Sequence, residues 1–111
     1  MFELTVSVSG ATVKVLFVGD IVGKAGRRTA SELILKIGDR EEIDFTIANG
    51  ENVAGGFGIT ENLARKLYSY GIGCVTSGNH LWDRKEIVPY LEADHRLLRP
   101  ANYPPGTPGF G

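Results

Sequence analysis

The side chains of this sequence that could do chemistry stand in three short polar clusters, and each cluster directly follows an apolar run. They comprise two carboxylates, two carboxamides and one imidazole. Carboxylate and amide oxygens with little nitrogen suit Mn, Fe or Mg better than a closed structural zinc site. An imidazole beside them could act as a general acid. The clusters are Asp20, then Glu51 with Asn52, then Asn79 with His80.

Each of these residues also has an ordinary structural interpretation when it is considered alone. Asp20 could cap a helix, and Asn52 or Asn79 could form an Asx turn. Glu51 could be an exposed loop residue, and His80 could be a half-buried histidine with its hydrogen bonds satisfied. We favour a functional site because all five side chains follow strands that are expected to end on one edge of one sheet.

The apolar runs predict an α/β fold in which strands alternate with helices. Strands are expected at residues 13–18, 43–48 and 74–77, with a fourth at 95–98. This alternation favours right-handed crossovers and a mostly parallel sheet, whose strands all end on the same edge. Ligands of such sheets bind at that edge. The three polar clusters are therefore expected to meet there.

Apolar residues at helical spacing predict the connecting helices. The first helix is expected to follow a loop that contains Gly23 and Gly26, and to end at Gly38. The second is expected to begin after Thr60 as its N-cap and to end at Gly71. The apolar stripe of the first helix consists of Ala30, Leu33, Ile34 and Ile37, and that of the second of Leu63, Leu67 and Tyr70.

The stretch after the third polar cluster is expected to hold a short helix and then a loop. Asp83 and Glu86 have the spacing of a capping box, and Pro89 should shorten or kink the helix that follows. Trp82 is expected to shield the edge of the site or to pack on the core, with stacking on a nucleobase as the alternative. From residue 99 the chain is rich in proline and glycine, which predicts a loop.

Residues 1–12 leave two alternatives open. Apolar and polar residues alternate from Phe2 to Ser9, which is the pattern of a half-buried strand. Gly10 could turn this strand back along residues 13–18 as a hairpin. Equally, residues 1–12 could be a loose leader that is additional to the domain.

The composition favours one small domain that acts on a small ligand. Of 111 residues, 42% are hydrophobic and 23% are charged, which is typical of a globular protein. We expect no membrane span and no secretory signal. The net charge of −1 gives no support for a broad nucleic-acid surface. The single cysteine, Cys74, cannot form an internal disulfide, which fits a cytoplasmic protein.

Four longer runs carry a resemblance to a known family. They are residues 18–23 (VGDIVG), 49–56 (NGENVAGG), 78–83 (GNHLWD) and 99–104 (RPANYP). In this order they resemble the calcineurin-like metallophosphoesterases, and within them the bacterial YmdB-type 2′,3′-cyclic-nucleotide 2′-phosphodiesterases. The resemblance covers about residues 13–111. It implies that these residues form the N-terminal part of one metallophosphoesterase domain, an α/β sandwich.

The resemblance also implies a two-metal site with Fe or Mn, or else Mg, that hydrolyses a small phosphodiester or cyclic nucleotide by an activated hydroxide. Asp20 would bind the first metal, and Asn52 would complete that side. Glu51 would bridge the two ions, and Asn79 would bind the second. His80 would face the phosphate as general acid or charge stabiliser.

Two departures from the wider superfamily affect what is expected. Val22 stands where the superfamily usually has a histidine, which agrees with the narrower branch. The family domain is about twice this length and draws further histidine ligands from its second half, whereas this chain has only His80 and His95. The 111-residue chain alone is therefore expected to be inactive and to self-associate. There are two alternatives. One is a non-catalytic nucleotide- or metal-binding α/β module, and the other is a structural half-domain that pairs with another chain.

Overall fold

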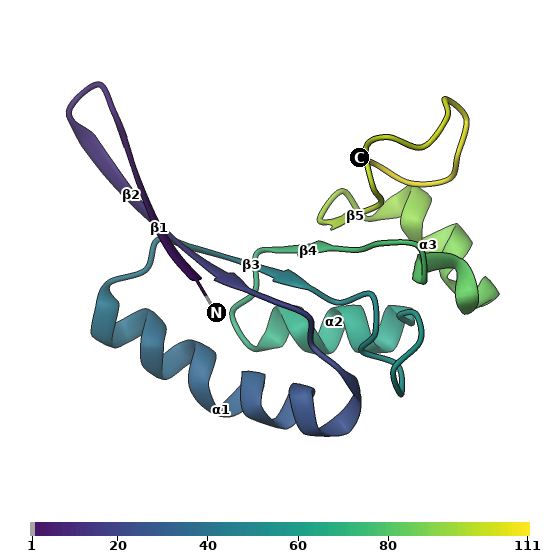
Figure 1. Cartoon of the computed structure of the whole chain (residues 1–111), viewed down its shortest axis with the longest axis horizontal. Coiled ribbons are helices and arrows are strands. Elements are labelled where there is room, and N and C mark those ends of the chain that lie inside the picture. The colour runs from purple at the N-terminus through teal and green to yellow at the C-terminus, as the bar shows by residue number, and fades with distance from the viewer. Residues whose placement is uncertain (1) are drawn as a thin grey trace.

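The computed structural model describes residues 2–111, and for residues 2–4 and 8 it describes the backbone alone. Its strands are β1 (Phe2–Val8), β2 (Ala11–Val18), β3 (Phe45–Asn49), β4 (Cys74–Thr76) and β5 (Leu97–Leu98). They form one sheet in the order β1-β2-β3-β4-β5 (Figure 1). β1 pairs with β2 antiparallel, and the other neighbours pair in parallel.

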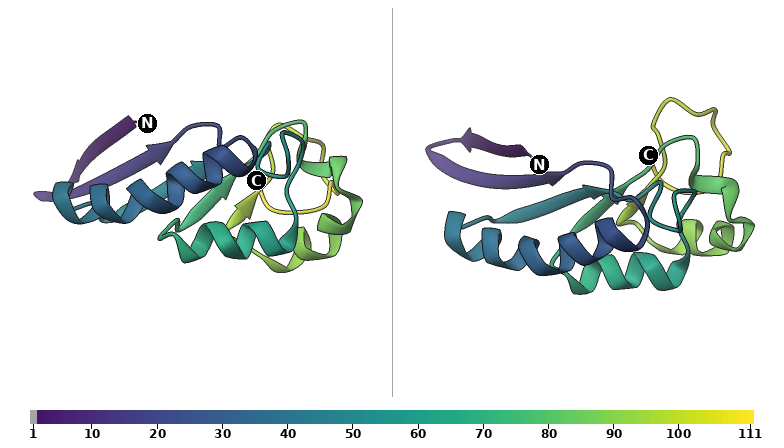
Figure 2. Two further views of the ribbon diagram at one scale, coloured as in Figure 1. Left: turned by 90° about the horizontal axis from the view of Figure 1, so that it is seen from below. Right: turned by 60° about the horizontal axis from the view of Figure 1, so that its bottom comes forward.

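Helices connect the parallel strands and lie on one face of the sheet. They are α1 (Gly23–Glu41), α2 (Glu61–Ser69) and α3 (Val88–Ala93), with 3-10 turns at Leu81–Asp83 and Lys85–Ile87. Because β2 to β5 are adjacent in chain order, right-handed crossovers place their connections on the same side. Figure 2 shows α1 and α2 there, side by side below the strands. The structure confirms the predicted α/β fold with a mostly parallel sheet.

The core lies between this face of the sheet and the helices. Alternate strand residues are buried there, and they pack with buried residues of α1 and α2. The residues between them in sequence point to the other face, where Phe17 and Ile47 are only half-buried and Phe45 is 44% exposed. The buried set includes Leu16, Val18, Ala48, Val75 and Leu97 from the strands, with Ala30, Ile34, Ala64 and Leu67 from the helices.

The N-terminal residues adopt the hairpin, one of the two alternatives that the sequence left open. β1 pairs with β2 in a register that sets Val6 opposite Val13, and Ser9 and Gly10 form the turn with positive φ angles. The hydroxyls of Ser7 and Thr12 lie 3.3 Å apart across the two strands. Figure 1 shows this hairpin projecting beyond the helical layer.

Two expectations about α1 were wrong. Gly23 and Gly26 do not lie in a loop, because the helix already begins at Gly23. Gly38 does not end the helix, which continues to Glu41. The chain leaves it at Glu42, whose left-handed backbone lets its N–H donate to the carbonyl of Gly38. A single glycine costs a helix only about 1 kcal/mol, and packing of the apolar stripe outweighs this cost.

The expected start of the third helix was also wrong, whereas that of α2 was right. Thr60 caps α2, because its side-chain oxygen accepts a hydrogen bond from the N–H of Leu63 at 3.3 Å. Asp83 does not cap α3. Its carboxylate instead contacts His80, and α3 begins at Val88 with Pro89 in its first turn, where proline is tolerated.

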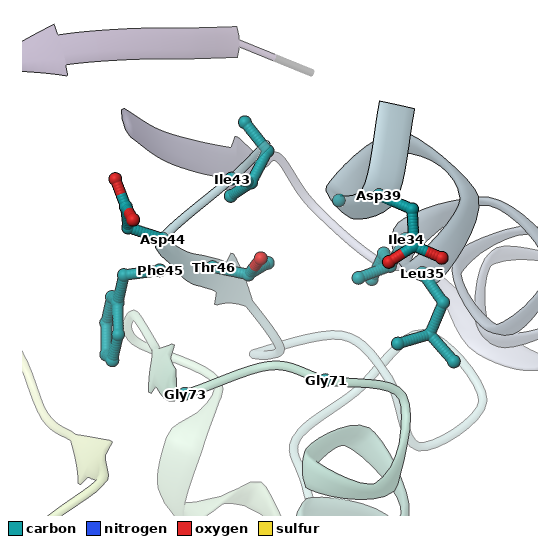
Figure 3. A pocket seen from close by; sticks show the side chains of 10 residues that line it. Ile34, Leu35, Asp39, Ile43, Asp44, Phe45, Thr46, Gly71 and Gly73 are labelled. Atoms are coloured by element: carbon teal, nitrogen blue, oxygen red, sulfur yellow. The ribbon is translucent and has the colours of Figure 1, made fainter. Parts of the chain in front are cut away.

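One cavity lies at the opposite end of the sheet from the polar clusters. It has a volume of about 220 Å³ and opens between the last turns of α1 and the start of β3 (Figure 3). Asp39, Asp44 and Gly73 are among its lining residues. None of the five candidate site residues is among the described residues that line it. Within residues 2–111, no helix is both long enough and apolar enough to cross a membrane.

Candidate functional site

Backbone hydrogen bonds join the loops that carry the three polar clusters. The N–H of Ile21, after β2, donates to the carbonyl of Asn49 at the end of β3 at 3.1 Å. The N–H of Gly50 donates to the carbonyl of Thr76 at the end of β4 at 3.0 Å. The strands therefore end side by side, as the sequence predicted, and the polar residues follow at one edge.

The structure brings Asp20 and Asn52 into direct contact. The side-chain amide of Asn52 donates to both carboxylate oxygens of Asp20, at 3.0 and 3.2 Å. The backbone supports this contact, because the N–H of Gly23 donates to the carbonyl of Asn52 at 3.1 Å. The other side-chain oxygen of Asn52, Oδ1, is buried and has no hydrogen-bond partner among the described residues.

The Glu51 carboxylate lies against the third polar cluster. A Cβ atom placed on Gly78 would be 2.6 Å from Cδ of Glu51 and would also overlap its carboxylate oxygens. Only glycine leaves room for the carboxylate at this position. The carboxylate oxygen Oε2 of Glu51 is buried and, within the described part of the chain, accepts no hydrogen bond. Glu51 thus links the end of β3 to the turn that begins at Gly78.

His80 is held in this turn by two contacts. Its Nδ1 atom lies 2.8 Å from Oδ2 of Asp83, so an Nδ1–H group donates to the carboxylate. Its ring also meets the ring of Phe57 edge to face, with centroids 5.6 Å apart and planes at 73°. Asp83 therefore fixes a proton on Nδ1, which leaves Nε2 as the nitrogen that this contact does not engage.

Asn79 shares the turn with His80, and its side chain is exposed. Among residues 2–111, the side chain of Asn79 makes no hydrogen bond to another residue. Over the same residues, no three His, Cys, Asp or Glu side chains gather closely enough to hold a metal ion. Of the four candidate oxygen donors at this edge, the structure therefore shows a direct side-chain contact for Asp20 with Asn52.

Two arginines that the sequence analysis did not single out hold the glycine-rich loop of residues 53–58. Arg27 of α1 donates to the carbonyl of Val53 at 2.6 Å. Arg84 donates to the carbonyls of Ala54 at 3.1 Å and Phe57 at 3.3 Å. No local pattern marks these arginines, because their partners are backbone carbonyls distant in sequence.

Trp82 packs within the chain. Its ring meets that of Tyr103 with centroids 4.6 Å apart, and it lies partly buried against the core. This position agrees with the structural interpretation of Trp82 rather than with a role as an open stacking platform. His95 precedes β5, and its ring stacks on that of Phe110 with centroids 4.0 Å apart, so it packs against the C-terminal loop.

The chain is similar in sequence and in fold to several known proteins. The chain is 44% identical over 99 residues to a protein of Bacillus subtilis (strain 168) named 2′,3′-cyclic-nucleotide 2′-phosphodiesterase. The match covers 89% of this chain and 38% of that protein. This chain thus spans well under half the length of that relative.

Two solved structures are similar in fold. A hypothetical protein from Thermus thermophilus superposes with a TM-score of 0.80 at 44% identity, over 87% of this chain and 37% of that chain. A structure described as a novel phosphatase from Mycoplasma pneumoniae superposes with a TM-score of 0.83 at 26% identity, over 99% of this chain and 38% of that chain. A family model described as YmdB-like protein matches residues 16–111. The chain therefore belongs to the family of YmdB-like proteins.

Proposed function

We propose that this chain carries part of the active site of a metal-dependent phosphodiesterase that acts on 2′,3′-cyclic nucleotides or related small phosphodiesters. The supporting observation is the contact between Asp20 and Asn52 beside a Glu51 carboxylate that reaches the turn of His80. The name of the Bacillus subtilis relative supports the substrate class.

The donor atoms at this edge fit divalent cations. Oε2 of Glu51 and Oδ1 of Asn52 are buried without a hydrogen bond from any described residue. A buried polar atom without a partner is costly, and a charged one more so. Bound cations would satisfy such atoms. Carboxylate and amide oxygens are ligands that Mn, Fe and Mg accept, so the residues present fit the implied metals.

In this proposal Asp20 and Asn52 would hold one ion, Glu51 would bridge to a second, and Asn79 would bind that second ion. Two such ions, when bound, would supply Lewis-acid charge and lower the pKa of water. Asn52 orients the Asp20 carboxylate through its amide. Glu51 keeps the two sides together, and Gly78 leaves it the necessary room.

His80 would act on the substrate rather than on the metal. Because Asp83 accepts the Nδ1 proton, Nε2 is the atom that can hold a second proton. From Nε2 an imidazolium could stabilise the charged phosphate and protonate the departing ribose oxygen, which typically accelerates such a step by about 10²–10⁴-fold. Asp83 is a positioning residue in this scheme.

The ligand count limits what the chain does alone. Two ions with five or six ligands each need about ten bonds, and four side chains with a few waters do not supply them. We therefore propose that activity requires further ligands beyond those of residues 1–111, and that the chain forms the N-terminal part of one domain. Its single cysteine fits the cytoplasm as its compartment.

The test compares two proteins. One is the 111-residue chain. The other, the extended protein, is a fusion in which this chain is followed by the residues that come after the matched region in the Bacillus subtilis relative. With Mn²⁺, the extended protein should hydrolyse 2′,3′-cyclic AMP, and the chain alone should not. No hydrolysis by a folded, metal-loaded extended protein would contradict the proposal and would favour a non-catalytic binding module.

His80→Ala in the extended protein separates the proposed roles. Its kcat should fall by about 10²-fold or more, while its metal content by elemental analysis stays near that of the parent. Asp83→Asn should lower kcat at unchanged metal content, because the amide no longer fixes the Nδ1 proton. Loss of metal in His80→Ala would instead show that the imidazole is a ligand.

A further inference from the structure

The chain displays one aromatic ring at the edge where the candidate site lies. Phe57 is 59% exposed, more than any other large hydrophobic side chain that the structure describes. Burial normally stabilises a phenyl ring, so this ring, left open beside polar residues, forgoes that stabilisation. Residues 55–58 read Gly-Gly-Phe-Gly, so this ring is the only side chain that the segment carries.

The loop that carries Phe57 is held in place rather than free. Its N–H donates to the carbonyl of Ala54 at 3.3 Å, and its carbonyl accepts from Nε of Arg84 at 3.3 Å. Gly58 has a φ of +70°, and a Cβ there would be 3.0 Å from the carbonyl oxygen of His80. The glycine thus lets the loop pack directly on the turn of His80. The backbone that carries the ring is therefore held in place.

The geometry of the contact with His80 leaves ring surface available. The two rings meet edge to face, with centroids 5.6 Å apart. Such a contact covers at most one face of the phenyl ring, and the side chain is 59% exposed, so part of the ring surface is accessible. A planar group stacked there would lie next to His80, whose turn also carries Asn79.

We propose that Phe57 is the platform on which the base of a nucleotide substrate stacks, and that it thereby sets the preference for nucleotides over phosphodiesters without a base. This inference rests on the proposed function. Every base has a π-face, so stacking on Phe57 tolerates all four bases and favours the larger purines. The Trp82 ring, packed on Tyr103, does not offer the same surface.

Nuclear magnetic resonance on the 111-residue chain tests the platform without turnover. Adenosine should move the ring-proton signals of Phe57 upfield and should also shift those of the His80 imidazole, whereas ribose at the same concentration should not. Phe57→Tyr should keep the shift at His80, and Phe57→Leu should lose it. Leu35→Ala is the matched control, because Leu35 is 56% exposed on α1. Equal shifts at His80 in Phe57→Leu and the parent would overturn the inference.

Kinetics of the extended protein distinguish this inference from the proposed function. For 2′,3′-cyclic AMP, Phe57→Leu should raise KM by about 5- to 100-fold with little change in kcat. For methyl riboside 2,3-cyclic phosphate, which lacks a base, KM should stay unchanged. Equal effects on both substrates, or on neither, would refute the platform while leaving the phosphodiesterase intact. Failure of the parent on both substrates would count against the proposed function, and the adenosine titration would still decide the platform.

Discussion

The side-chain amide of Asn52 lies 3.0 and 3.2 Å from the two carboxylate oxygens of Asp20, although 31 residues separate the two in sequence. This contact orients the carboxylate, and it leaves Oδ1 of Asn52 buried without a partner among the described residues. Asn52 thus both holds one proposed ligand and offers a second.

Asn52→Leu should therefore weaken Mn²⁺ binding to the chain by about 10- to 100-fold, the usual effect of losing a supporting contact at a metal site. Isothermal titration calorimetry would measure this. Asn62→Leu, an exposed asparagine of α2, is the control and should bind as the parent does. Equal affinities for parent and Asn52→Leu would show that Asn52 takes no part in the site.

Gly78→Ala should damage the site more than the fold. The new methyl group would displace the flexible Glu51 carboxylate, so the free energy of unfolding should change by about 1 kcal/mol or less. Mn²⁺ affinity should fall by about 10-fold or more, by the same reasoning as for a displaced ligand. Gly19→Ala is a matched control after β2, because a Cβ there has no described atom within 4 Å. Similar Mn²⁺ affinities in the two variants would argue against a role for Glu51 as ligand.

The apolar runs of the sequence predicted the strands well, because most residues on both faces of these strands are apolar. The predicted bounds of β3 were too early by two residues at its start and by one at its end. Ile43 is apolar, but pairing with β2 begins only at Phe45. The sequence pattern also predicted that α1 ends at Gly38, because local propensity carries no information on the packing that extends the helix to Glu41.

For the candidate site, the sequence could place the polar clusters at one edge but could not predict their partners. The contact of Asp20 with Asn52 depends on the path of two loops. The spacing of Asp83 is compatible both with capping a helix and with a contact to His80. The fold of the turn determines that Asp83 contacts His80. Phe57 is marked in the sequence as a single aromatic residue among glycines. Its proximity to His80 depends on how the loop folds, which the sequence pattern does not show.

Asp94 links α2 to the segment before β5, and its contribution to stability should depend on pH. Burial alone would raise the pKa of Asp94, but hydrogen bonds from Tyr90, Tyr68 and the N–H of Arg96, with the Arg96 charge, lower it below its ordinary value of 3.8. A lowered pKa in the folded state means that this stabilisation is complete above the unfolded value and is lost as pH falls below about 4.

Asp94→Asn should lower the free energy of unfolding at pH 7 by about 1–3 kcal/mol, because it replaces a charged acceptor that Tyr68 contacts at 2.7 Å. Urea unfolding at pH 7 and pH 3 would measure this, and the difference from the parent should shrink at pH 3. Asp39→Asn, an exposed aspartate of α1, is the control. A difference that is as large at pH 3 as at pH 7 would contradict this account of Asp94.

The half-buried face of the sheet should make the chain self-associate. Val13 shares this face with Phe17 and Ile47 and is 41% exposed, and exposed apolar sheet surface favours association. Val13→Lys should weaken the association in sedimentation equilibrium. Leu33→Lys, at a position 39% exposed on α1, should not. A monomeric parent that melts reversibly above about 65 °C would contradict this expectation, because that exceeds the usual mesophile range.

The most direct test of the central claim is the Mn²⁺-dependent hydrolysis rate of 2′,3′-cyclic AMP by the extended protein and its Glu51→Gln variant. A neutral amide is a poor bridge between two cations, so Glu51→Gln should abolish turnover. Glu61→Gln, which changes an exposed glutamate paired with Arg65, should leave the rate unchanged. Removal of metal should abolish hydrolysis by the parent protein, and added Mn²⁺ should restore it. Full activity of Glu51→Gln, or of the metal-free parent, would contradict the claim that these strand ends form a metal-dependent phosphodiesterase site.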